Sequence, residues 1–405
     1  MQMRKIKLFF LMIILFGAVS CTKDDPSSHN GEEKEEEIEG EPEAVILKMV
    51  DASATLETKA LYSNLWKIQS KGFMFGHHDD LLYGRDWITE QNRSDVKEVV
   101  GDYPAVYSID FAEIMDERSE GNSMNEHRKR TILEARRRGE VIIANAHLNN
   151  PVTGGDSWDN SNPTVVRQIL ENGSEANIKF KSWLDNLVSF VTSLKDDNGN
   201  LIPIILRPYH EHTQSWSWWG SSNTSQSEFI ALWKFTVDYL RNERGVHNLI
   251  YAISPQLDGA GTRASLLYRW PGDDYVDFIG MDSYNGTNST ALAINVKNLA
   301  ELSREKKKPV GITETGIEGV RKGNAQEYPE YWTKEILNPI VGKDISMVVM
   351  WRNKYDPAHS GYHFYGPYIG HSSSSNFVEF YESTFTLFSR DLPKIYEMAE
   401  GVTVN

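Results

Sequence analysis

Residues 202–211 read IPIILRPYHE, a short apolar run that ends in charged and polar side chains. The run is almost continuously apolar up to residue 206, as expected for a parallel strand buried on both faces; a half-exposed antiparallel strand alternates apolar and polar residues. Other runs share this character, at residues 72–75, 105–109, 141–145, 248–253, 276–280, 309–313 and 346–351. The sequence therefore predicts eight buried parallel strands.

Stretches with helical spacing separate most of these strands. Helices are predicted at residues 54–69, 127–138, 178–194, 228–242, 291–306 and 329–337. Repeated strand–helix units predict an α/β fold, a (β/α)8 TIM barrel that forms a single catalytic domain. A doubly wound open sheet is the alternative, but no Gly-x-Gly-x-x-Gly follows an early strand.

Polar and aromatic side chains follow every predicted strand, at the end where barrel enzymes place their active sites. In strand order they are His77, His78, Asp79 and Asp80; Asp110 and Glu113; His147, Asn149 and Asn150; Arg207, His210, Glu211 and His212; Gln256; Asp282 and Tyr284; Glu314; and Trp351, Arg352 and Asn353. Loop composition alone does not account for this concentration on strand after strand. We expect an active site at this end of the barrel.

Two carboxylates stand out among these residues, because Glu211 follows the fourth strand and Glu314 the seventh. Cleavage of a glycosidic bond needs one carboxyl group to protonate the leaving oxygen and a second to act at the anomeric carbon. Opposed strand ends of one barrel can place two such groups a few ångströms apart. The pair therefore indicates a glycoside hydrolase, with a solvated strand-end position as the alternative for either residue alone.

The motif Arg207-Pro208-Tyr209-His210-Glu211 followed by Trp216, together with Gly311-Ile312-Thr313-Glu314, resembles glycoside hydrolase family 26, in which endo-β-1,4-mannanases dominate. The histidine before the strand-four glutamate is a mark of that family within its clan. The resemblance implies a retaining mechanism with Glu211 as general acid/base and Glu314 as nucleophile. It also implies substrate-binding or orienting roles for His147, Trp158, His210, Trp216, Tyr284, Trp351 and Arg352.

Elementary electrostatics agrees with these roles. Partial burial and the nearby charge of Glu314 would raise the pKa of Glu211, as an acid working near neutral pH requires. Donors such as Arg207 and Tyr284 would keep Glu314 ionised. Indole rings are suitable platforms for the apolar faces of sugars. Trp216 is expected in that role, whereas Trp218 and Trp219 fit a platform or the core equally well.

No metal site and no cofactor are expected. The chain has no His-Glu-x-x-His helix and no cysteine pair. If the strand continues through residues 210–212, His210 and His212 share one face while Glu211 points to the other, so the three cannot chelate one ion.

The N-terminus carries a secretion signal over residues 1–20, since basic residues precede an apolar run that ends in small residues. The single cysteine, Cys21, follows directly and excludes an intrachain disulfide. The stretch Gly17-Ala18-Val19-Ser20-Cys21 resembles a bacterial lipobox, which implies lipid modification of Cys21. Lys23-Asp24-Asp25 resembles the acidic tag of Bacteroides-type surface lipoproteins. An outer-membrane lipoprotein at the cell surface is therefore predicted, with a periplasmic location as the alternative.

Residues 21–43 are expected to form an acidic, solvated tether, with ten acidic residues against two lysines. The signal adds three positive charges, so residues 44–405, the predicted catalytic domain, keep −10 of the formal charge of −15. This acidic balance argues against a nucleic-acid partner. We expect a monomer.

The predicted reaction is retaining hydrolysis of β-1,4-mannosidic bonds in mannan, galactomannan or glucomannan. Within the same family, mixed-linkage β-glucan or β-1,3-xylan remain alternative substrates, because the catalytic residues do not distinguish them. A non-catalytic, glycan-binding surface lipoprotein is the alternative from another class.

Overall fold

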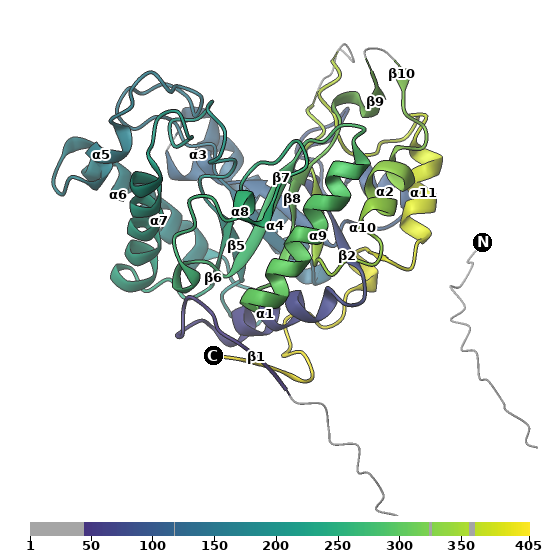
Figure 1. Cartoon of the computed structure of the whole chain (residues 1–405), viewed down its shortest axis with the longest axis horizontal. Coiled ribbons are helices and arrows are strands. Elements are labelled where there is room, and N and C mark those ends of the chain that lie inside the picture. The colour runs from purple at the N-terminus through teal and green to yellow at the C-terminus, as the bar shows by residue number, and fades with distance from the viewer. Residues whose placement is uncertain (1–43, 117, 324–325, 356–360) are drawn as a thin grey trace, which may run out of the picture. The chain divides into compact units, whose positions relative to one another are not determined.

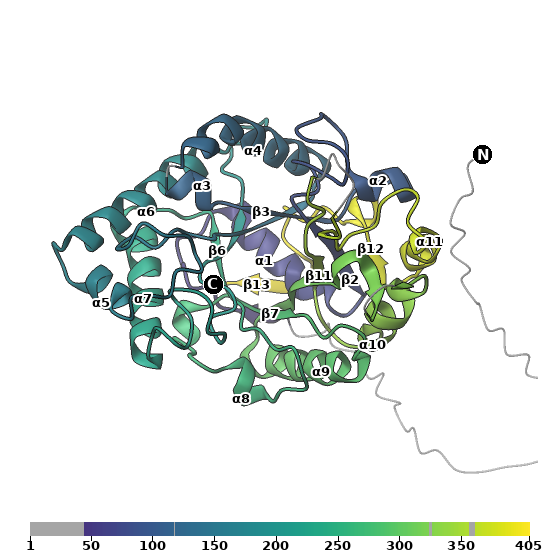
Figure 2. The ribbon, with the colours of Figure 1, turned by 90° about the horizontal axis from the view of Figure 1, so that it is seen from above.

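Eight parallel strands close into a barrel in the computed structural model, which describes residues 44–405 except 117, 324–325 and 356–360 (Figures 1 and 2). Each strand pairs with the next in chain order, and β11 closes the ring by pairing with both β8 and β2. The strands are β2 Phe73–His78, β3 Val106–Asp110, β4 Val141–Asn145, β5 Ile204–Arg207, β6 Leu249–Ile253, β7 Phe278–Ser283, β8 Val310–Thr315 and β11 Met347–Met350. The predicted (β/α)8 barrel is confirmed.

The strands are buried on both faces, which explains their nearly continuous apolar sequences. In β2, Met74 belongs to an apolar cluster with inward-facing residues of other strands, whereas Phe75 belongs to a second cluster with the surrounding helices. Phe75 packs edge-on against Trp332 and Phe377 and stacks on Phe388. Alternate residues of one strand therefore hold the barrel interior and the outer layer together.

Helices cover the outside of the barrel, as predicted. The long ones are α4 Ser119–Arg138, α6 Glu175–Ser193, α7 Gln226–Asp238 and α9 Ser289–Lys306. Helix α7 continues as a π-helical segment, η1 Tyr239–Glu243. The helix expected at residues 329–337 is also π-helical, η4 Trp332–Leu337, and is followed by the short helix α10 Asn338–Ile340. The sequence pattern predicted the position of this helix but not that its turns are π-helical.

The other end of the barrel is closed by α1 Leu56–Ile68, predicted before the first strand, and by a strand pair that the sequence did not suggest. Strands β1 Val45–Leu47 and β13 Val402–Val404 pair in parallel. Leu61, Tyr62 and Leu65 of α1 share a core cluster with Leu47 and with inward-facing strand residues. The two ends of the described chain therefore meet beneath the barrel, leaving the carboxyl ends of the strands for the long connections.

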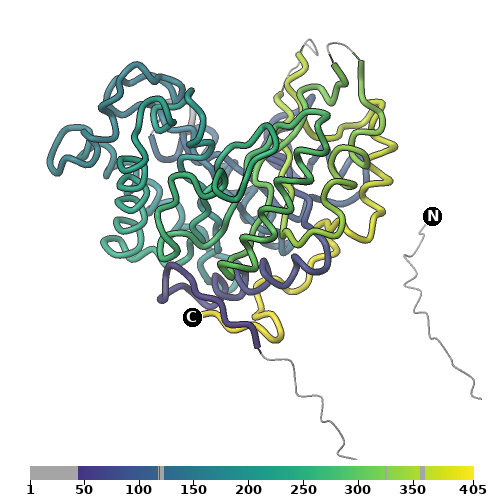
Figure 3. The backbone as a smooth tube through the Cα atoms, viewed as in Figure 1, coloured from purple at the N-terminus to yellow at the C-terminus, as the bar shows by residue number. Residues whose placement is uncertain are grey.

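The segments between and after the strands also contain several short elements: α2 Asp95–Val100, α3 Ala112–Met115, α5 Val165–Leu170, α8 Arg263–Leu266, η2 Asp273–Tyr275, η3 Glu318–Val320, the β9 Arg321–Lys322 and β10 Gln326–Glu327 pair, α11 Ser374–Glu382, β12 Thr386–Leu387 and η5 Ser389–Asp391. Figure 3 shows the segments after β4 and after β8 and β11 extending beyond the strand ends on two sides. Among the described residues, no helix is long and apolar enough to cross a membrane. The predicted signal, Cys21 and the tether lie outside the described residues.

Candidate active site

The segment after β5 turns sharply and does not continue the strand. Strand β5 ends at Arg207, and both Tyr209 and Glu211 have positive φ, at 53° and 54°. The Glu211 amide donates to the Ser254 carbonyl at the end of β6, at 2.8 Å, which fixes the turn. The assumption of an extended backbone through residues 210–212 is therefore wrong. The left-handed backbone is a strained conformation of the kind that clusters at functional sites.

A buried arginine joins the ends of β5, β7 and β8. Arg207 Nη2 donates to Glu314 Oε2 at 2.8 Å, and Nη1 donates to Asp282 Oδ2 at 2.5 Å. All three side chains are at most 6 % exposed. Burial opposes the charged form of Arg207, but the carboxylates of Asp282 and Glu314 raise its pKa. The guanidinium is therefore a fixed positive charge beneath Glu314.

Glu314 receives a second hydrogen bond from the neighbouring strand end. Tyr284 Oη donates to Glu314 Oε1 at 2.6 Å. Burial and then the negative charge of Glu314 raise the pKa of Tyr284 well above 10, so the phenol stays protonated and donates. The hydrogen bonds predicted from Arg207 and Tyr284 to Glu314 are both present. Each carboxylate oxygen of Glu314 thus accepts a hydrogen bond from a buried donor.

Glu211 lies in the opposite electrostatic situation. Glu211 is 6 % exposed. Burial, and to a smaller extent the negative charge of Glu314, raises the pKa of the Glu211 carboxyl well above 4.5. Arg207 acts in the other direction but does not compensate. A buried carboxyl group with a raised pKa can keep its proton near neutral pH, which is what a general acid requires.

Two histidine rings meet beside Glu211. His147 Nε2 and His210 Nε2 are 3.1 Å apart, so one of them carries the proton that the other accepts. His147 Nδ1 lies 2.5 Å from Asp110 Oδ2. Burial opposes ionisation of Asp110, but the charge of His147 and this hydrogen bond lower its pKa. Burial lowers the pKa of His210 well below 6.5, so that ring is neutral.

The tryptophans after β4 and β5 divide into two groups. Trp218 and Trp219 are fully buried, and their indole N–H groups donate to the carbonyls of Leu148 and His210. They are core residues that support the turn. Trp216 is half-buried and lies edge-on to Trp158, with ring centres 6.2 Å apart, and Trp158 is 64 % exposed. Only this second pair is available to a ligand.

A cavity of about 330 Å³ lies among the ends of β2, β3, β4 and β11, and we call it the inner cavity. Trp351 stacks on His78 with ring centres 4.3 Å apart, and Arg352 Nη1 donates to Tyr83 Oη at 3.2 Å. Tyr83 Oη in turn donates to Asp79. The lining residues are Asp79, Tyr83, Asp110, Ala112, Glu113, Arg118, Arg128, His147, Trp158, Trp351, Arg352 and His363.

The structure thus brings the predicted residues to one end of the barrel in two sets. The first set consists of Arg207 and Tyr284, which donate to Glu314, and of the neighbouring Glu211. The second set lines the inner cavity and consists of His147, Trp158, Trp351 and Arg352. Sequence reasoning did not single out Tyr83, Arg118 or His363, because they lie in connections whose path the pattern does not fix. Across the described residues, no cluster of three His, Cys, Asp or Glu side chains has a geometry suited to a metal ion.

Comparison with known proteins agrees with this architecture. Residues 50–333 match the sequence family described as glycosyl hydrolase family 26. The chain belongs to this family. A mannan endo-1,4-beta-mannosidase of Bifidobacterium adolescentis is 34 % identical in an alignment that covers 67 % of this chain and 28 % of that protein. This chain thus spans less than a third of that relative's length.

Two solved structures of the family superimpose on the barrel. A GH26 beta-mannanase from Bacteroides ovatus is 38 % identical and has a TM-score of 0.77, covering 85 % of this chain and 98 % of that one. A modular endo-beta-1,4-mannanase from Cellulomonas fimi is 30 % identical with a TM-score of 0.79, covering 88 % and 81 %. The whole barrel, and not one motif, is shared with this family.

The pKa of Glu211 offers a test that does not depend on activity. Replacing Glu314 with Gln removes the neighbouring negative charge while keeping the size of the side chain, so the pKa of Glu211 is expected to fall. Carboxyl ¹³C NMR titration would measure it, with Glu211→Gln identifying the resonance. A Glu211 pKa that is unchanged or higher in Glu314→Gln would contradict the proposed coupling.

Proposed function

We propose that this family 26 barrel hydrolyses β-1,4-mannosidic bonds of mannan, galactomannan or glucomannan with retention of configuration. One observation carries the proposal: Glu314 accepts hydrogen bonds from Arg207 and Tyr284, while burial and the charge of Glu314 raise the pKa of Glu211. Retaining glycosidases need this pairing of a nucleophilic carboxylate with a protonated carboxyl group.

In the first step, a Glu314 carboxylate oxygen bonds to the anomeric carbon as the glycosidic C–O bond breaks, and Glu211 gives its proton to the leaving oxygen. In the second step, water attacks the anomeric carbon, Glu211 takes a proton from it, and the bond to Glu314 breaks. The coupling of the two carboxyls suits this exchange of roles. Once Glu314 is esterified its negative charge is gone, so the pKa of Glu211 falls and the group becomes a base.

The surrounding residues supply the sugar contacts in this proposal. Trp216 and Trp158 offer half-buried and exposed indole surfaces, and Trp351 lies at the inner cavity beside Arg352. His147 and His210 are held by each other and by Asp110, which fixes their ring orientation. Pre-positioned donors of this kind bind a sugar without first having to be ordered. The choice of mannan rests on the relatives, which are described as mannanases.

Polysaccharide comparison tests this function and its nearest alternatives. We expect reducing sugar to be released from β-mannan at least tenfold faster than from mixed-linkage β-glucan or β-1,3-xylan. In the Glu314→Ala variant the release should fall by more than a thousandfold, because the covalent step has no nucleophile. Arg207 keeps Asp282 as an ionic partner in this variant, so circular dichroism should still show a folded barrel.

Faster release of reducing sugar from glucan or xylan than from mannan would contradict the proposed substrate but not the proposed mechanism. Binding of mannan without any product would instead support a glycan-binding lipoprotein. Substantial hydrolysis by Glu314→Ala would contradict the catalytic assignment.

For location, we propose a monomeric lipoprotein of the outer membrane, facing outward and anchored through Cys21. The support is the lipobox-like sequence at residues 17–21 and the acidic stretch that follows. Metabolic labelling with a fatty acid should tag the wild-type chain and not Cys21→Ser. Equal labelling of both would contradict the anchor.

A further inference from the structure

The segment between Glu211 and α7 carries three tryptophans, and we call residues 212–224 the tryptophan loop. It consists of turns and bends. Trp216 lies edge-on to Trp158, whereas Trp218 and Trp219 are buried. A segment without helix or strand pairing needs hydrogen bonds to other parts of the barrel to keep one conformation. The partners of this loop therefore matter for everything that it positions.

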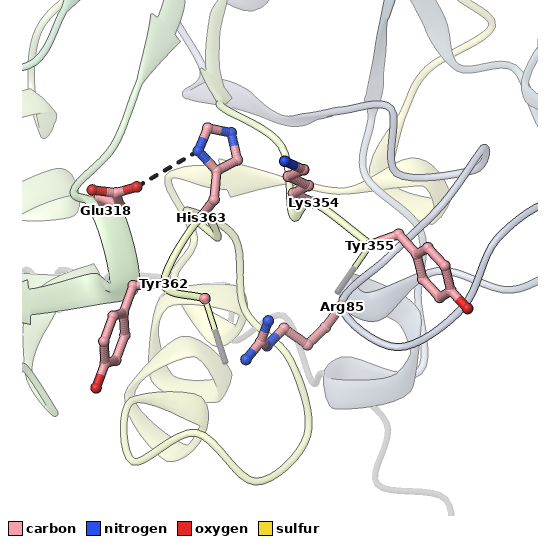
Figure 4. A pocket seen from close by; sticks show the side chains of 7 residues that line it. Arg85, Glu318, Lys354, Tyr355, Tyr362 and His363 are labelled. Atoms are coloured by element: carbon pink, nitrogen blue, oxygen red, sulfur yellow. Dashed lines mark ion pairs between the residues drawn. The ribbon is translucent and has the colours of Figure 1, made fainter. Parts of the chain in front are cut away.

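The tryptophan loop and the side chains drawn in Figure 4 belong to different connections of the barrel. Those side chains come from the connections after β2, β8 and β11, and Glu318 pairs there with His363. The loop follows β5 and meets the connection after β6. Because Glu211 directly precedes the loop, contacts that hold the loop also act on the proposed acid.

One buried arginine contacts the tryptophan loop at three points. Arg269 lies between α8 and η2, in the connection after β6, and is fully buried. Its Nη1 donates to the carbonyls of His212 and Trp219, at 3.0 and 3.2 Å, and to the Thr224 hydroxyl at 2.9 Å. Its Nη2 donates to the Thr224 carbonyl. The guanidinium thus contacts the beginning, the middle and the end of the loop.

The surroundings of Arg269 fix the direction of its side chain. The residue has a φ of 63°, a left-handed backbone that persists at a non-glycine residue only where neighbouring structure fixes it. The guanidinium lies over the ring of Phe229 in α7, 5.3 Å from its centre. The ring of His212 stacks on the same phenylalanine, with centres 4.4 Å apart. Phe229 therefore packs against both the cation and the first residue of the loop.

The contact between Arg269 and the loop joins a cation to neutral oxygen atoms. Burial, and then the charge of Arg269, lowers the pKa of His212 to about 3, so this buried ring adds no second positive charge. The acceptors are carbonyls and a hydroxyl. Hydrogen bonds from a charged donor are stronger than those between neutral groups, and a buried guanidinium that loses them is left unsatisfied. Displacement of the loop is therefore opposed.

Two of these hydrogen bonds act on the residues on either side of Glu211. The His212 carbonyl accepts from Arg269 directly. Trp219 accepts from Arg269 through its carbonyl and donates from its indole to the His210 carbonyl at 2.8 Å. Both neighbours of Glu211 are thus held from Arg269, one directly and the other through Trp219.

We propose that Arg269 is a positioning residue for proton transfer by Glu211. The proposal rests on the function proposed above. Arg269 donates to the backbone of the loop and acts on the reaction through the left-handed turn that carries Glu211. Misplacement of a catalytic group by ~1 Å can cost on the order of 10²-fold in rate.

The nucleophile is held by other residues, so loss of Arg269 should affect the two carboxyl groups unequally. Glu314 accepts from Arg207 and Tyr284, at the ends of β5 and β7. Removing the guanidinium of Arg269 leaves both of these donors in place. The proton transfer should therefore suffer more than the attack on the anomeric carbon.

The test compares two aryl β-glycosides of the shortest manno-oligosaccharide that the wild type cleaves. The 2,4-dinitrophenyl group leaves without a proton, whereas the phenyl group needs one. We expect Arg269→Met to lower kcat/KM for the phenyl glycoside about tenfold more than for the dinitrophenyl glycoside, within the ~10²–10⁴-fold that general acid catalysis contributes. Methionine keeps an apolar side chain in the buried space.

Thr224→Val is a second variant that keeps the guanidinium. It removes a hydroxyl that accepts from Arg269 and donates to the Trp219 carbonyl at 3.0 Å, with little change of shape. We expect the difference between the two glycosides to be about threefold, as for the loss of one neutral hydrogen bond. If circular dichroism shows that Arg269→Met does not fold, this variant decides the question.

Arg241→Met is the matched control. Arg241 also donates to a main-chain carbonyl, that of Val50 at 2.8 Å, and it pairs with Asp238 at the end of α7. Because this contact involves neither the tryptophan loop nor Glu211, the control should change both glycosides equally, to within about twofold.

A larger loss on the phenyl glycoside in Arg269→Met or Thr224→Val, but not in Arg241→Met, supports the proposal. An equal loss on both glycosides would show a purely structural role and overturn it, as would unchanged kcat/KM for both. Wild-type cleavage of the glycosides shows that the proposed function stands in those cases. If the wild type cleaves no aryl manno-oligosaccharide and no mannan, the function and this inference both fail.

Discussion

The buried guanidinium of Arg207 is the interaction on which the rest of the site depends. It bridges Asp282 at the end of β7 and Glu314 at the end of β8. Asp282 is fully buried and Glu314 is 5 % exposed. Removing one member of such a buried pair typically costs about 3–5 kcal/mol, because the remaining charge has no partner. The same contact holds the Glu314 carboxylate in place, and the negative charge of that carboxylate helps to raise the pKa of Glu211. One ion pair thus positions Glu314 close enough for its charge to act on the pKa of Glu211.

The barrel makes this arrangement possible, because the three strand ends converge. Strands β5, β7 and β8 are fixed by parallel pairing and by cores on both faces, so the side chains at their ends have little freedom. The left-handed turn at Tyr209 and Glu211 then places the Glu211 carboxyl over the same opening. Its support comes from below, where Trp219 donates to the His210 carbonyl. A strained backbone on a rigid base is suited to holding a catalytic group in one position.

Burial of the strands and the geometry of the backbone explain how much of the fold and of the site the sequence could predict. Continuous apolar runs identified all eight barrel strands, and the polar residues after them identified Glu211, Glu314, His147 and Arg352 as neighbours in space. The pattern ended this strand at residue 206, next to its observed end at Arg207, but it could not show the turn that follows, since positive φ at Tyr209 and Glu211 leaves no mark in residue type. Nor could it choose between core and ligand roles for Trp218 and Trp219. The path of the connections, which places Tyr83 and His363 at the inner cavity, depends on long-range contacts such as those of Asp95.

In the proposed mechanism Glu314 forms a covalent bond with the sugar while Glu211 transfers the proton. Reaction of the protein with a 2-deoxy-2-fluoro-β-mannosyl fluoride, followed by mass spectrometry, would detect this bond, because the fluorine slows release of the sugar from the enzyme. We expect one 2-fluoromannosyl group per chain, located on Glu314 by peptide fragmentation and absent from Glu314→Gln. A chain that turns over mannan but carries no such group, or carries it on Glu211, would contradict the proposed roles.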